Sequence, residues 1–125
     1  MKALSISALL LLALVLTVTP LSAHHSWPVT YDHLVTVKGT VKDFQWANPH
    51  PMMTIEVTGN DGKVQKWQIG GPAINRMEAN GWNKSTVKPG DTITGIGYQF
   101  ADGQKIVRLE RVVLQDGREL RLYGK

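Results

Sequence analysis

The feature that most constrains the fold is a run of alternating apolar and polar residues that begins at Leu34. The small or apolar positions on one face of this run are Val35, Val37, Gly39 and Val41. A period of two predicts a half-buried strand. After Asp43 the apolar positions move by one residue, to Phe44 and Trp46. This phase slip predicts a bulge near Lys42 and Asp43, and a long, bent first strand favours a small closed barrel over a flat sheet.

Further strands and one helix follow, separated by turns rich in Gly, Pro, Asn and Asp. The pattern predicts a short helix at residues 73–79 and strands at residues 53–57, 64–69, 92–100, 105–114 and 119–123. Three antiparallel strands, a helix, two more strands and a short extension are the order of the OB-fold, a five-stranded partly open barrel. We therefore predict an all-β fold with one short helix and an OB-fold-like barrel. A small antiparallel sandwich or roll is the alternative.

The first 23 residues have the order of a secretory signal peptide. Lys2 supplies a positive charge, residues 3–18 are apolar apart from two Ser and one Thr, and the segment ends in the small residue Ala23. We expect cleavage after Ala23, which leaves no transmembrane anchor and delivers the protein to the periplasm. The expected organisation is a signal peptide at residues 1–23, an N-terminal arm at residues 24–33 and a barrel at residues 34–125.

Length, charge and composition limit what the mature chain can do. Removal of 23 of the 125 residues leaves 102, enough for one domain. The net charge falls from +4 to +3, because Lys2 is the only charged residue removed. The basic residues are spread singly along the chain, so we expect no nucleic-acid partner. The absence of Cys excludes disulfide scaffolds and cysteine nucleophiles. No nucleophile triad, phosphate loop or carboxylate pair is recognisable, so we expect no enzyme.

All four histidines lie near the expected mature N-terminus, at His24, His25, His33 and His50. Cleavage after Ala23 would make His24 the first residue, so that its α-amine and its imidazole Nδ1 can bind one metal ion together. Both groups lose their protons near neutral pH. Nitrogen-rich coordination favours Cu(II), which also heads the affinity order of the divalent metals. The pattern predicts a site for Cu(II) or another late transition metal.

His50 is the best candidate for a third ligand, because prolines flank it on both sides and restrict the backbone of its loop. His25 is the alternative to His50, and His33 is a candidate for a further ligand. Met52 offers a thioether sulfur of the kind that suits Cu(I), although alternation allows only one of Met52 and Met53 to face the His50 side. Ordinary explanations stay open: a terminal tail, a packing histidine and methionines that fill gaps in the barrel.

Trp46 and Trp67 indicate a second class of site. Both are expected on strands that pair around the barrel, where aromatic side chains usually fill core or cross-strand positions. If exposed, they would form, with Asn48 and Met52, a ligand-binding face for a protein, a peptide or an envelope saccharide. The alternative to a metal carrier is therefore an OB-fold interaction module that holds no metal.

Several motifs together resemble a bacterial family of small exported proteins named DUF6152. The motifs are Ala23-His24-His25-Ser26, Gly39-Thr40-Val41, Phe44-Gln45-Trp46-Ala47-Asn48-Pro49-His50, Gly81-Trp82, Lys88-Pro89-Gly90-Asp91 and Asp116-Gly117-Arg118. The resemblance covers nearly the whole chain and implies export and a small β-barrel, but the family name carries no activity. It marks His24, His25 and His50 as candidate functional residues.

At the level of one residue, His24 is also similar to the first residue of the copper histidine brace in periplasmic copper-resistance carriers and lytic polysaccharide monooxygenases. Those proteins are immunoglobulin-like sandwiches, so the likeness implies a shared chemistry and no shared ancestry. Together these observations predict an exported carrier or buffer for copper that uses His24, His50 and His25.

Overall fold

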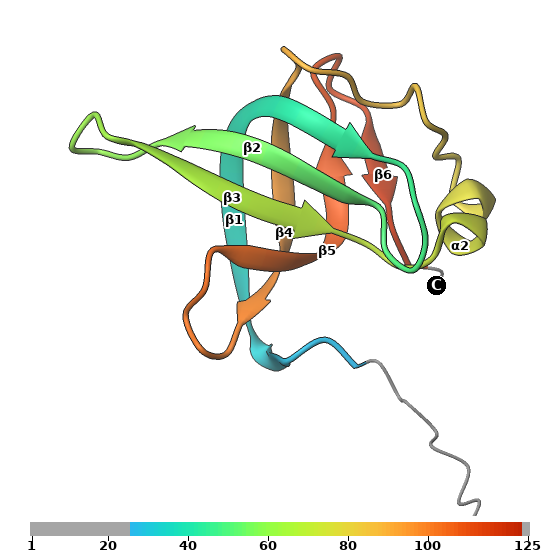
Figure 1. Cartoon of the computed structure of the whole chain (residues 1–125), viewed down its shortest axis with the longest axis horizontal. Coiled ribbons are helices and arrows are strands. Elements are labelled where there is room, and N and C mark those ends of the chain that lie inside the picture. The colour runs from blue at the N-terminus through green and yellow to red at the C-terminus, as the bar shows by residue number, and fades with distance from the viewer. Residues whose placement is uncertain (1–25, 124–125) are drawn as a thin grey trace, which may run out of the picture.

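Six strands and one short helix make up residues 26–123, which are the residues that this computed structural model describes (Figure 1). The expected signal peptide, together with His24 and His25, lies outside the described residues. The elements are β1 (Val29–Gln45), β2 (Met52–Thr58), β3 (Val64–Gly70), α2 (Ile74–Ala79), β4 (Thr92–Phe100), β5 (Ile106–Val113) and β6 (Glu119–Arg121). Within this part of the chain, no helix combines the length and the apolar character needed to cross a membrane.

Five of the strands form a closed ring. The antiparallel order β3-β2-β1-β4-β5 is closed by a parallel pairing between β3 and β5, where Ile69 lies opposite Val107. The sixth strand, β6, continues the sheet beyond β5. The helix α2 lies between β3 and β4 and sits at one end of the ring (Figure 1). This is the predicted OB-fold-like architecture, so the expectation of an all-β fold with one short helix is confirmed.

The long first strand is central to the ring because it pairs with both β2 and β4. Its pairing with β2 shifts register between Val41 and Asp43, so the predicted bulge is present. The strand begins at Val29 and not at Leu34, however, and thus includes half of the segment expected to be an irregular arm. The cause is long-range pairing: Val29 lies opposite Phe100, and the N–H of Ala101 donates to the carbonyl oxygen of Pro28 at 2.9 Å.

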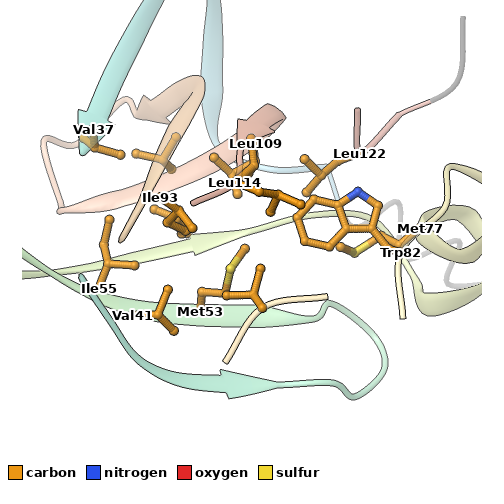
Figure 2. Packing of buried hydrophobic residues seen from close by; sticks show 14 residues of the cluster. Val37, Val41, Met53, Ile55, Met77, Trp82, Ile93, Leu109, Leu114 and Leu122 are labelled. Carbon is orange, nitrogen blue, oxygen red and sulfur yellow. The ribbon is translucent and has the colours of Figure 1, made fainter. Parts of the chain in front are cut away.

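One core fills the inside of the ring (Figure 2). Alternate residues of every long strand point into it, as the period of two predicts. Its fully buried members include Val41, Ile55, Ile69, Ile93, Val107, Leu109 and Val112. Gly97 allows β4 and β5 to approach closely, because a Cβ atom there would collide with the carbonyl oxygen of Arg108 and lie 2.8 Å from the Cα of Leu109.

The end of the ring below α2 is closed by a smaller group of apolar side chains. Met77 of the helix, Trp82 from the segment after it and Leu122 from beyond β6 are all buried (Figure 2). The indole N–H of Trp82 donates to the carbonyl oxygen of Arg121 at 2.8 Å. The helix therefore closes one end of the barrel.

Candidate functional site

An open depression lies where the N-terminal segment, the β1–β2 loop and the facing ends of β4 and β5 meet. Its volume is about 420 Å³, and its lining is mainly apolar. The lining residues are Ser26, Trp27, Pro28, Pro49, His50, Met52, Phe100 and Ile106. The loops between strands one and two and between strands four and five border the ligand-binding region of OB-folds. The depression thus occupies the region of the fold in which ligands are commonly bound.

His50 is held in a defined orientation at this depression. Its Nδ1 lies 3.1 Å from the carbonyl oxygen of Gly71. Because a carbonyl oxygen can only accept, Nδ1 carries the proton and donates it, which leaves the lone pair of the neutral ring on Nε2. The ring of Trp27 packs against the imidazole at a centroid distance of 4.8 Å and also contacts Phe100 edge-on at 5.8 Å. Metal-binding histidines generally make this kind of second hydrogen bond through the nitrogen that does not bind the metal.

The two neighbouring methionines take opposite sides of β2. Met52 lines the depression, whereas Met53 is buried in the core. The sulfur of Met52 lies over Gly70 on β3, where a Cβ atom would collide with it. The prediction that only one methionine can face the His50 side is confirmed, and that residue is Met52.

Ser26 connects the depression to the two residues that precede it. Ser26 is the first of the described residues, and it lines the depression. The predicted ligands His24 and His25 lie outside the described residues. Within residues 26–123 no group of three or more His, Asp or Glu side chains is placed to hold a metal ion.

His33 is not brought to this depression. It lies on β1, is exposed to solvent, and is absent from the lining. The alternation of β1 and its pairing with β4 decide this position, which the spacing of the histidines in the sequence does not reveal. The described structure therefore brings together His50 and Met52, and leaves His33 apart from them.

The other members of the predicted ligand-binding face also have different surroundings. Trp46 follows β1 and Trp67 lies in β3, and both are partly buried against the core. The side-chain oxygen of Asn48 accepts a hydrogen bond from the backbone N–H of Ile74 at 3.1 Å, at the first turn of α2. Of the four residues predicted for this face, only Met52 lines the depression.

Trp27, Phe100 and Ile106 also line the depression, and of these the sequence did not single out Phe100 and Ile106. Phe100 and Ile106 stand at the two ends of the β4–β5 turn, and Trp27 precedes the first strand. Their positions follow from pairing between strands far apart in the sequence. The one indication for Trp27 in the sequence was its closeness to His25, a candidate metal ligand.

Comparisons with known proteins support the fold and leave the activity open. A crystal structure of Rim1, a mitochondrial single-stranded DNA binding protein from S. cerevisiae, has a similar fold, with a TM-score of 0.50 and 11% sequence identity. The similarity covers 66% of this chain and 92% of Rim1. At this identity the likeness concerns the fold alone. No curated protein matches the sequence. Residues 12–108 match the model of a family of unknown function, and the chain therefore belongs to the DUF6152 family.

Proposed function

We propose that the protein is an exported, periplasmic carrier or buffer for copper and not an enzyme. The observation that carries this proposal is the meeting of His50, Met52 and Ser26 at one depression. An imidazole and a thioether there lie beside the point at which His24 and His25 join the described chain. The proposed ligands are the amine and imidazole of His24 and the Nε2 atom of His50, with His25 as the alternative to His50.

The chemistry of these donors suits a metal that changes oxidation state. Nitrogen ligands favour Cu(II), and thioether sulfur favours Cu(I), so Met52 would retain the reduced ion. The hydrogen bond from His50 to Gly71 supports this role, because it leaves Nε2 as the acceptor nitrogen in the neutral ring. The surrounding Trp27, Phe100 and Ile106 would limit the access of water to the bound ion.

Titration with Cu(II) tests the proposal. Two forms of the protein are compared: one is exported and processed to begin at His24, and the other carries one additional N-terminal Gly. Calorimetry and electron paramagnetic resonance follow the binding of Cu(II) to each form. We expect one-to-one binding with nitrogen hyperfine structure in the first form and a clear loss of affinity in the second. Equal, weak binding by both forms would refute the proposed metal site. Terminal sequencing of the exported protein checks the cleavage site in the same sample.

A second candidate function is an interaction module that holds no metal and binds an envelope protein, peptide or saccharide. The apolar depression between the two loops favours it, because OB-folds commonly bind polymers in this region. Tryptophan fluorescence separates the two functions. Since Trp27 packs against His50, bound Cu(II) should quench its emission stoichiometrically, whereas an interaction module should show no quenching at equimolar Cu(II).

A further inference from the structure

A second depression lies on the outer face of the sheet and shares no lining residue with the depression at His50. Its volume is about 200 Å³. The lining residues are Leu34, Ile96, Tyr98, Glu110, Arg111, Arg121 and Tyr123. They come from β1, β4, β5, β6 and the residues just after β6. The lining therefore combines an apolar wall with guanidinium groups and a phenol.

Strand pairing explains this combination. Leu34 lies opposite Tyr98 in the β1–β4 pair, and Ile96 lies opposite Arg111 in the β4–β5 pair. The neighbouring β5–β6 pair places Arg111 opposite Arg121. Leu34 is 51% exposed and is therefore accessible at the rim of the depression. Apolar side chains thus border two adjacent arginines along one surface.

Two buried polar atoms at this depression lack hydrogen-bond partners among residues 26–123. One is Nε of Arg111, which lies 3.8 Å from the nearer carboxylate oxygen of Glu119, too far for a hydrogen bond. The other is the hydroxyl of Tyr123: the indole of Trp27 beside it can only donate, so the hydroxyl proton has no acceptor. Unpartnered buried polar atoms are uncommon in native proteins and require an explanation. Both groups can donate, so a ligand with acceptor oxygens would satisfy them.

The charges around the depression favour an anion. Glu110 is the one carboxylate in the lining, and it forms an ion pair with the guanidinium of Arg108. Arg108 is itself held over the ring of Tyr123, with 3.8 Å between its central carbon and the ring centroid. Arg121 forms no ion pair within the described residues, and Arg111 has only the long contact to Glu119. Positive charge is therefore left uncompensated beside an apolar wall.

We propose that this depression binds a carboxylate that carries a short apolar group. Its two oxygens accept from Arg111, Arg121 and the Tyr123 hydroxyl, and its apolar group contacts Leu34 and Ile96. Guanidinium groups match carboxylates in planar, charge-assisted pairs, which makes them suitable for this recognition. The carboxylate belongs either to a small organic acid or to the C-terminus of a peptide, and the two sources share the same chemistry.

The test uses the mature protein, with isothermal calorimetry and backbone amide NMR shifts as readouts. The small-molecule probes are isovalerate, its neutral analogue isovaleramide and inorganic phosphate. The peptide probes are a short peptide ending in Leu with a free C-terminus and the same peptide with an amidated C-terminus. We expect isovalerate to bind at least about tenfold more tightly than isovaleramide, because a charge-assisted hydrogen bond is lost in the amide.

Two variants locate the binding, and a third serves as the control. Arg121→Gln and Tyr123→Phe should each weaken isovalerate binding, by about tenfold for the arginine. Arg118→Gln removes the same charge from the β5–β6 turn, outside the depression, and should leave the affinity unchanged. Amide shifts should be largest in β4, β5 and β6. Stronger binding of the free peptide than of isovalerate supports a peptide C-terminus as the source, and equal binding supports a small acid.

Three outcomes would overturn the proposal. One is equal binding of isovalerate and isovaleramide, and another is equal loss of affinity in Arg118→Gln and Arg121→Gln. The third is phosphate binding more tightly than every carboxylate, since this would indicate attraction of anions by charge alone. None of these results depends on copper, so the outcome stands apart from that of the metal titration.

Discussion

Single residues decide the chemistry that this protein has available. His50 differs from His33 in its surroundings and not in its type. The first is fixed by Gly71 and Trp27 at a depression, and the second is exposed on β1. The chain thus supplies a matched pair of histidines with which the proposed copper site can be tested.

We expect His50→Ala to weaken Cu(II) binding by about tenfold or more, because even groups that only orient a ligand contribute this much. His33→Ala should bind Cu(II) as the unchanged protein does. Calorimetric titration of the two variants measures the difference. Equal affinities in the two variants would remove His50 from the site.

Tyr123 provides a prediction about alkaline pH. Burial raises the pKa of its phenol above the usual 10.0, and Glu110 adds to the increase while Arg108 opposes it. The folded state therefore holds this proton more tightly than the unfolded state. The associated stability is fully present below pH 10.0 and is lost as the pH rises through the higher folded pKa.

Tyr123→Phe should remove this part of the alkaline loss of stability. Urea unfolding at a series of pH values from about 8 to 11 measures this loss of stability in the variant and in the unchanged protein. At neutral pH the variant should be as stable as the unchanged protein or slightly more so, because a buried hydroxyl without a partner is removed. Tyr31→Phe, at a side chain that is 60% exposed, is the control and should retain the alkaline loss.

At the scale of elements, the β1–β2 loop connects the candidate site to the helix. The helix α2 has no side-chain cap of its own, and Ala73 occupies its N-cap position. Asn48 supplies an acceptor to Ile74 from 26 residues earlier in the chain. Asn48, which the sequence predicted to contact a ligand, therefore anchors the first turn of α2.

Asn48→Ala should lower the free energy of unfolding by about 1 kcal/mol, the usual cost of a lost helix cap. Asn48→Asp keeps the acceptor oxygen and should retain most of the stability. Chemical denaturation of both variants gives the comparison. A loss of stability in Asn48→Asp as large as that in Asn48→Ala would contradict the capping role.

The close approach of β4 and β5 gives a second prediction at this scale. Gly97→Ala should lower the free energy of unfolding by about 1–3 kcal/mol, because the added methyl group collides with backbone atoms that cannot move aside easily. Gly95→Ala is the comparison. Its methyl group would meet the side chain of Leu109 at 2.8 Å, and a side chain can rotate away. The midpoint temperature of thermal unfolding should therefore be well below that of Gly95→Ala in the Gly97→Ala variant.

At the scale of the whole molecule, Trp82 joins parts of the chain that lie far apart. Trp82 is 2% exposed and packs near Met77 and Leu122 at one end of the barrel (Figure 2). Its indole N–H donates a hydrogen bond to the backbone carbonyl oxygen of Arg121. Trp82→Ala should lower the free energy of unfolding by about 3–5 kcal/mol. Val64→Ala, at a side chain that is 59% exposed, should change it by less than about 0.5 kcal/mol. Urea denaturation distinguishes the two, and similar losses would contradict a closing role for Trp82.

The agreement between sequence and structure varies with the range of the interactions. The bulge after Val41, the β2–β3 turn and the bounds of β4 were all predicted, because alternation and turn residues act over a few neighbours. The start of β1 was missed by five residues, since Val29 joins the sheet only through its partner Phe100. Local pattern contains no information about that partner.

The candidate site shows the same division. The sequence by itself determined the inward face of the first strand and the rule that only one of Met52 and Met53 can lie on the outer side of β2, because both follow from a period of two. Only the tertiary structure decided that His50 is oriented by Gly71, that Trp27 packs on it and that His33 stays apart. It also decided that Arg111 and Arg121 meet beside Leu34. These outcomes depend on which strands pair and in which register, and that choice is made by the packing of the whole core.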